Sequence, residues 1–99
     1  MLKLSKKLRT TETDAPELGT MVRAVRRKRG GEGVFCVMHS EATNGMMEIA
    51  PLSYAKFEAG KRDITVFGLA KSKKEALELV RQIVDDLAKK GQWDVSEYL

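Results

Sequence analysis

The last third of the chain contains the pattern that most restricts the fold. An apolar run, Ile64 to Leu69, is followed after a short polar turn by a segment, Lys73 to Lys90, with every signal of an amphipathic helix. Ser72 and Glu75 have the spacing of a capping box, and Gly91 is placed to end the helix. Apolar residues form one stripe at positions 76, 80, 83 and 87, widened by positions 77, 79, 84 and 88. The pairs Asp85–Lys89 and Asp86–Lys90 have the spacing at which opposite charges support a helix. We therefore predict a helix over this segment, packed on a sheet in which 64–69 is a central strand.

A second amphipathic helix is predicted near the N-terminus. Asp14 and Glu17 have the spacing of another capping box, and Pro16 falls in the first turn, where its missing N–H costs nothing. Leu18, Met21, Val22 and Val25 follow as one apolar stripe, cations crowd the last turn, and Gly30-Gly31 ends the helix.

The remaining segments predict short strands. Val34 to His39 is rich in strand-forming residues, and Asn44-Gly45 is a hairpin signal that makes 46–50 the return strand. Two segments stay open: 1–12 reads as an edge strand or a flexible basic tail, and 52–59 as a third strand or a helical turn. At the C-terminus, a short helical turn is expected to pack Trp93, Val95 and Tyr98 onto the body.

Together these elements predict one α+β domain spanning residues 1–99. It would have a small antiparallel sheet of three to four strands with two helices packed on one face. A composition of 42% hydrophobic and 32% charged residues is typical of a globular protein. One cysteine, no apolar leader and no long apolar run favour a cytoplasmic protein outside the membrane.

The positive charge is concentrated in the first thirty residues, which carry nine Lys or Arg against three acids, although the net charge of the whole chain is only +4. At the end of the first helix stand Arg23, Arg26, Arg27, Lys28 and Arg29. Such a surface favours nucleic-acid phosphates or an acidic partner. The alternative is a solvated helix end whose cations complement the dipole.

A second basic cluster lies at the start of the C-terminal helix and comprises Lys71, Ser72, Lys73 and Lys74. Free N–H groups at a helix start can bind an anion. The competing interpretation is that the Ser72 hydroxyl already occupies those donors.

The chemistry-bearing residues do not form a catalytic or metal-binding pattern. Cys36 and His39 are the only soft metal ligands, whereas a zinc site needs three or four, and these positions on a strand point to opposite faces. We predict no metal and no cofactor, with Cys36 in the core. One histidine and no convergent titratable group favour a protein that is not an enzyme.

The sequence therefore predicts a small non-enzymatic module that binds another protein, or a second copy of itself, through a sheet edge or a helix face. The alternative is a module that binds RNA or DNA through the basic end of the first helix. Tyr54, Phe57 and Phe67 would support single-strand binding only if their rings faced solvent.

Overall fold

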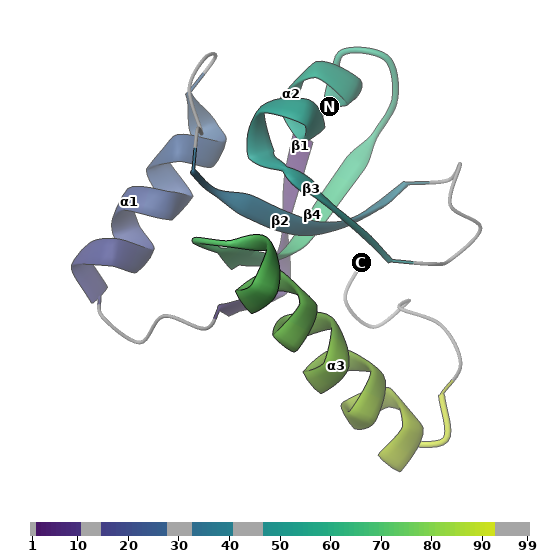
Figure 1. The fold of residues 1–99 in the computed structure, drawn as a ribbon. Coiled ribbons are helices and arrows are strands. Elements are labelled where there is room, and N and C mark those ends of the chain that lie inside the picture. Colours follow the sequence, from purple (N-terminus) through teal and green to yellow (C-terminus); the bar gives the residue numbers. More distant parts are fainter. Residues whose placement is uncertain (1, 11–14, 28–32, 41–46, 93–99) are drawn as a thin grey trace.

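The computed structural model of this chain describes residues 2–10, 15–27, 33–40 and 47–92. Figure 1 shows how these residues form a sheet with helices packed against it, which confirms the predicted α+β class. In chain order the elements are β1 (Leu2–Thr10), α1 (Ala15–Arg26), β2 (Phe35–Ser40), β3 (Glu48–Pro51), α2 (Leu52–Ala59), β4 (Ile64–Ala70) and α3 (Lys73–Lys89). The first residues are thus a strand, and 52–59 is a helix. The predicted Asn44-Gly45 turn and the C-terminal turn at 93–99 lie outside the described residues.

The sheet is mixed, with the strand order β1-β4-β2-β3. Strand β2 runs antiparallel to both β3 and β4, but β1 runs parallel to β4, with Leu2 opposite Ile64. The prediction of a wholly antiparallel sheet is therefore wrong for this pair. The chain leaves β1 through α1 and enters the sheet again at β2, two positions away from β1. Strand β4, which comes later in the chain, occupies the position between them and runs parallel to β1. Strands that follow one another in sequence need not pair, so local patterns do not fix this order.

Helices cover both faces of the sheet, and the prediction of two helices on one face is wrong. Met21 of α1 and Leu52 of α2 belong to one core cluster, which includes Ile64 and Val66 of β4. The buried side of α3 belongs to a second cluster, which includes Phe67 of the same strand. Because β4 is apolar on both faces, burying one face would leave the other exposed to water, and a helix on each side removes both from solvent.

A bulge in β4 lies beneath α3. Val37 of β2 lies opposite Gly68, whereas the next residue, Met38, lies opposite Val66, so Phe67 is the extra residue. A Cβ added to Gly68 would lie 3.0 Å from the Cβ of Val37 and 3.4 Å from Cδ1 of Leu79 in α3. Glycine at this position therefore lets the bulged strand and the helix approach each other closely.

Both ends of α3 have the predicted caps. The Ser72 hydroxyl accepts a hydrogen bond from the Glu75 N–H at 3.2 Å. At the other end Gly91 has a φ of 70°, its N–H donates to the Ala88 carbonyl, and the Gln92 N–H donates to the Leu87 carbonyl. These are the two bonds of a Schellman motif, which needs a left-handed residue at the Gly91 position.

Candidate functional site

Helix α3 carries more apolar surface than the sheet covers. By the 3.6-residue repeat, its apolar residues span about half of the circumference. The part of this apolar arc nearest the sheet is buried, and we call it the covered stripe. It consists of Ala76, Leu79, Ile83 and Leu87. Beside it runs a second row, Leu77, Val80, Val84 and Ala88, which we call the open stripe.

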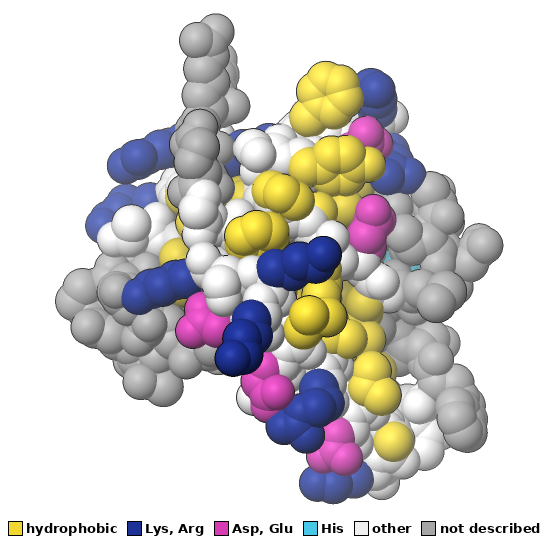
Figure 2. All heavy atoms as spheres, viewed as in Figure 1, with side chains coloured by type: hydrophobic (Ala, Val, Ile, Leu, Met, Phe, Trp, Pro, Cys, Tyr) yellow, Lys and Arg dark blue, Asp and Glu magenta, His cyan; other side chains and the backbone are white. Residues whose placement is uncertain are grey.

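The open stripe faces solvent. Leu77 is 53% exposed and Val84 is 51% exposed, while Val80 is partly buried against the core cluster under α3. Figure 2 shows hydrophobic side chains in a row along this flank of the helix. The sequence placed these residues on α3 correctly but treated them as part of the buried face. The sequence did contain a signal for this exposure. The apolar arc of α3 is wider than the strip of a helix that one sheet surface can cover, so some of its residues had to remain exposed.

The stripe continues toward the free edge of the sheet. Strand β3 pairs only with β2, and no described strand covers its outer edge. Met47 and Ile49 are partly buried and pack against the same core cluster as Val80. The open stripe and this edge therefore form one apolar region, which makes α3 the best candidate for an interaction surface.

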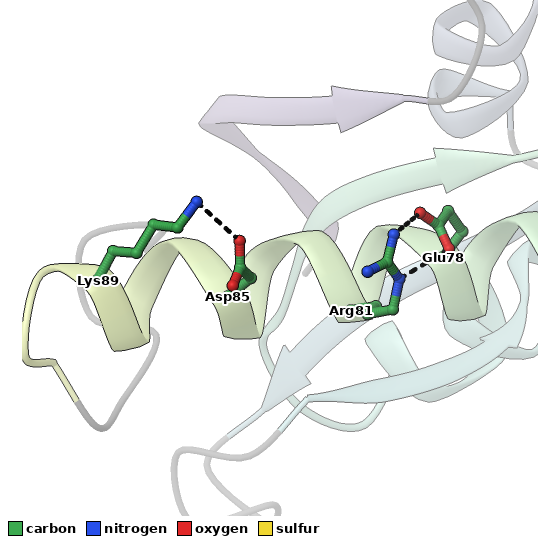
Figure 3. A network of polar contacts seen from close by, with 4 residues as sticks. All are labelled: Glu78, Arg81, Asp85 and Lys89. Carbon is green, nitrogen blue, oxygen red and sulfur yellow. Dashed lines mark hydrogen bonds and ion pairs between the residues drawn. The ribbon is translucent and has the colours of Figure 1, made fainter.

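The flank of α3 on the other side of the open stripe from the sheet is charged and satisfied within the helix. Glu78, Arg81, Asp85 and Lys89 follow one another along it (Figure 3). Arg81 Nε donates to Glu78 Oε2 at 3.0 Å, and Lys89 Nζ lies 3.1 Å from Asp85 Oδ2. The hydrogen bond from Arg81 lowers the pKa of the Glu78 carboxyl below its usual value. These contacts are local helix pairs at i, i+3 and i, i+4, so they explain the charged flank without a partner.

A further ion pair links α3 to the first strand. Arg9 Nη2 of β1 lies 3.5 Å from Asp86 Oδ2, and Lys90 Nζ lies 3.3 Å from the same oxygen. Asp86 therefore faces β1, whereas the open stripe lies toward β3. Arg9 is thereby directed to the α3 side of the sheet.

The predicted basic cluster lies at the end of α1. Arg23, Arg26 and Arg27 are exposed, and they form no ion pair within the described part of the chain. Lys28 and Arg29 lie outside the described residues. Arg26 also lines a shallow groove with Leu2, Leu4 and Val25, so the start of β1 lies beside the basic end of α1.

The predicted anion site at the start of α3 contains a carboxylate supplied by the chain. The Ser72 hydroxyl accepts the Glu75 N–H, and Glu75 Oε2 accepts the Lys71 N–H at 3.3 Å. Lys73 and Lys74 are exposed. An external anion would have to compete with Glu75 for these donors, so anion binding by Lys71, Ser72, Lys73 and Lys74 stays a prediction.

Cys36 lies in the core, as expected, and is fully buried. Burial raises the pKa of its thiol to about 12, so the group is protonated at neutral pH and is a poor nucleophile or metal ligand. Cys36 and Met38 pack in the α1 and α2 cluster and Val37 in the α3 cluster, so the strand alternation directs His39 away from Cys36. Among the described residues, no group of three or more potential ligands could hold a metal ion.

Two aromatic rings that the sequence left undecided face solvent. On α2, Tyr54 is 41% exposed and Phe57 is 64% exposed, while Phe67 is buried in β4. Lys61 Nζ lies 4.5 Å from the centre of the Phe57 ring, within the range of a cation–π contact. Exposed rings beside a cation are a second surface that a ligand could use.

Searches of protein-family models, curated proteins and solved structures find no match to this chain. Within the described residues, no helix is long and apolar enough to cross a membrane. Its function must therefore be inferred from its own residues.

Proposed function

We propose that this chain is a non-enzymatic protein-binding module and that its contact surface is the open stripe of α3 with the adjoining edge of β3. The observation that carries the proposal is the half-exposure of Leu77 and Val84 on a helix whose buried stripe, caps and charged pairs do not involve them. Covering the exposed half of each side chain would contribute about 1 kcal/mol per residue. Such a gain is available only on contact with another apolar surface.

The proposed contact surface does not depend on catalytic chemistry. A protein that binds through an apolar helix flank needs no titratable groups, and the open stripe contains none. The Cys36 thiol is buried on the other side of the sheet.

The test is site-specific photo-crosslinking in the cells that express the full chain. A photoreactive residue is placed at Leu77, and a matched control is placed at Gln82, which is exposed on the charged flank. We expect a discrete protein adduct from position 77 and none from position 82. Equal labelling at both positions, or no adduct at position 77, would overturn the proposal.

A second candidate function, nucleic-acid binding, is favoured by the exposed arginines of α1 and the exposed rings of α2. Arg23, Arg26 and Arg27 have no ion-pair partner among the described residues, so they are available to phosphates. Tyr54 and Phe57 could stack on bases.

The test of this candidate is fluorescence anisotropy with single-stranded oligonucleotides of about 12 nucleotides, at low and moderate salt. We expect binding that falls steeply with salt and weakens when the three arginines become Ala. Arg81→Ala removes one positive charge elsewhere and serves as the control. Undetectable binding at low salt would remove this candidate.

A further inference from the structure

We infer that the partner of the open stripe is a second copy of this chain, bound as an antiparallel α3–α3 pair about a two-fold axis. This inference rests on the proposed function and names its occupant. The axis would cross α3 between Val80 and Arg81, midway between Leu77 and Val84, so that Leu77 of each copy lies opposite Val84 of the other.

The first observation is that the stripe is self-complementary. Leu77 and Val84, its two large exposed members, are separated by about two helical turns. A two-fold axis exchanges the ends of the stripe, so a contact made by Leu77 with Val84 is made twice. Leu77, Val80 and Val84 also have the three-and-four spacing of the seam between paired helices.

The second observation is the distribution of charge along α3. The helix starts with Lys73 and Lys74, which are exposed and form no ion pair among the described residues, and its second half carries Asp85 and Asp86. The two lysines oppose the helix dipole, which favours acids at the start, although Glu75 in the first turn and Lys89 in the last turn agree with it. In an antiparallel pair, the lysines of one helix lie beside the aspartates of the other. Lys74 and Asp85 are on the same side of the seam, so Lys74 would approach the Asp85 carboxylate, which also contacts Lys89 of its own helix.

The residue nearest the axis does not oppose the pairing. Two copies of Arg81 would approach each other there, but each guanidinium is held by the Glu78 carboxylate of its own helix through two contacts. The charge at the axis is therefore balanced within each copy.

The size of the surface sets the expected strength of the dimer. A contact limited to the open stripe covers a few hundred Å² per copy, below the roughly 800 Å² of a stable complex. The open edge of β3 lies beside the stripe and extends the contact. We therefore expect a dimer that dissociates on dilution.

The first experiment measures the register by disulfide exchange in the full chain. Leu77→Cys and Val84→Cys variants are mixed and oxidised, and the control mixture pairs Leu77→Cys with Gln82→Cys. The native Cys36 is fully buried, so it does not compete. We expect the 77–84 disulfide to form faster than either disulfide between identical variants. No preference over the control mixture would overturn the antiparallel pair.

The second experiment measures the mass of the purified chain by sedimentation equilibrium at increasing concentration. We expect the average mass to rise from 11.1 kDa toward twice that value. Leu77→Glu should abolish the rise, whereas Gln82→Glu, the same charge on the other flank, should leave it unchanged. Circular dichroism confirms that both variants are folded.

A charge exchange tests the predicted contact between the two helices. Lys74→Glu and Asp85→Lys should each weaken the dimer, and the double variant should restore it.

The outcomes separate the two proposals. A chain that stays monomeric at all concentrations, but still gives an adduct with another protein at position 77, overturns the second copy and leaves the proposed function standing. A monomer that gives no adduct overturns both.

Discussion

Helix α3 carries two apolar stripes that look alike in the sequence and differ in what covers them. The covered stripe, which includes Leu79 and Ile83, packs on β2 and β4, while the open stripe, which includes Leu77 and Val84, faces solvent. Each has aliphatic residues at helical spacing. The difference teaches that an apolar arc wider than the available sheet surface divides into a part that stabilises the fold and a part that is free to bind. Four predictions test this division.

The largest effect is expected at the covered stripe. Ile83→Ala removes side-chain volume from a fully buried site, so the free energy of unfolding should fall by about 2–5 kcal/mol. Val84→Ala, the matched change on the open stripe, should cost under ~0.5 kcal/mol. Urea unfolding of the two dilute variants measures both values. Similar losses at the two positions would show that the stripes do not differ in burial.

The next effect concerns the bulge beneath α3. Gly68→Ala places a methyl group 3.0 Å from the Cβ of Val37, and we expect a loss of about 1–3 kcal/mol. Gly19→Ala is the control, because that added Cβ meets nothing within 4 Å and alanine favours a helix. The control should gain about 0.5–1 kcal/mol. Thermal unfolding measures both, and a neutral Gly68→Ala would mean that α3 does not rest closely on the bulge.

A smaller effect is expected at the start of the helix. Ser72→Ala removes the acceptor for the Glu75 N–H and should cost about 1 kcal/mol. Ser72→Asp keeps an acceptor at the same position and should recover most of the loss. The two variants are compared by urea unfolding. If Ser72→Asp were as unstable as Ser72→Ala, the cap would not explain the effect.

The smallest effect on stability is expected at the open stripe. Leu77→Gln replaces an exposed apolar side chain with a polar one of similar size, so the unfolding free energy of the dilute chain should change by under ~0.5 kcal/mol. The same variant should lose the adduct or dimer that defines the binding surface. A loss of stability above ~1.5 kcal/mol would instead assign Leu77 to the core.

The parts of the fold that depend on neighbours in sequence could be predicted from the sequence. The Ser72 cap, the Gly91 end and the Asp85–Lys89 pair all lie within one helix, and each is present as expected. The mainly apolar run 64–69 is one of the two central strands, and it is covered by helices on both faces.

The parts that depend on distant residues could not be predicted. The parallel pairing of β1 with β4 and the placement of helices on both faces follow from strand order, which no local pattern contains. The bulge at Phe67 changes which residues of β4 share a face, so simple alternation fails there. For the candidate site, the sequence located the basic end of α1 but not the open stripe, since exposure depends on how much of the helix the sheet covers.

The pairing of β1 also has a consequence for the order of folding. Leu2 lies opposite Ile64, so β1, which is synthesised before the rest of the sheet, has its only described strand partner in β4, the last strand of the sheet in chain order. The β2–β3 hairpin can form as soon as its own residues are synthesised, whereas closing the long loop between β1 and β4 carries a larger entropy cost. The N-terminal strand therefore docks late. Until then its leucines are exposed, and the lysines among them, which reduce pairing with other chains, protect the unfinished protein from aggregation.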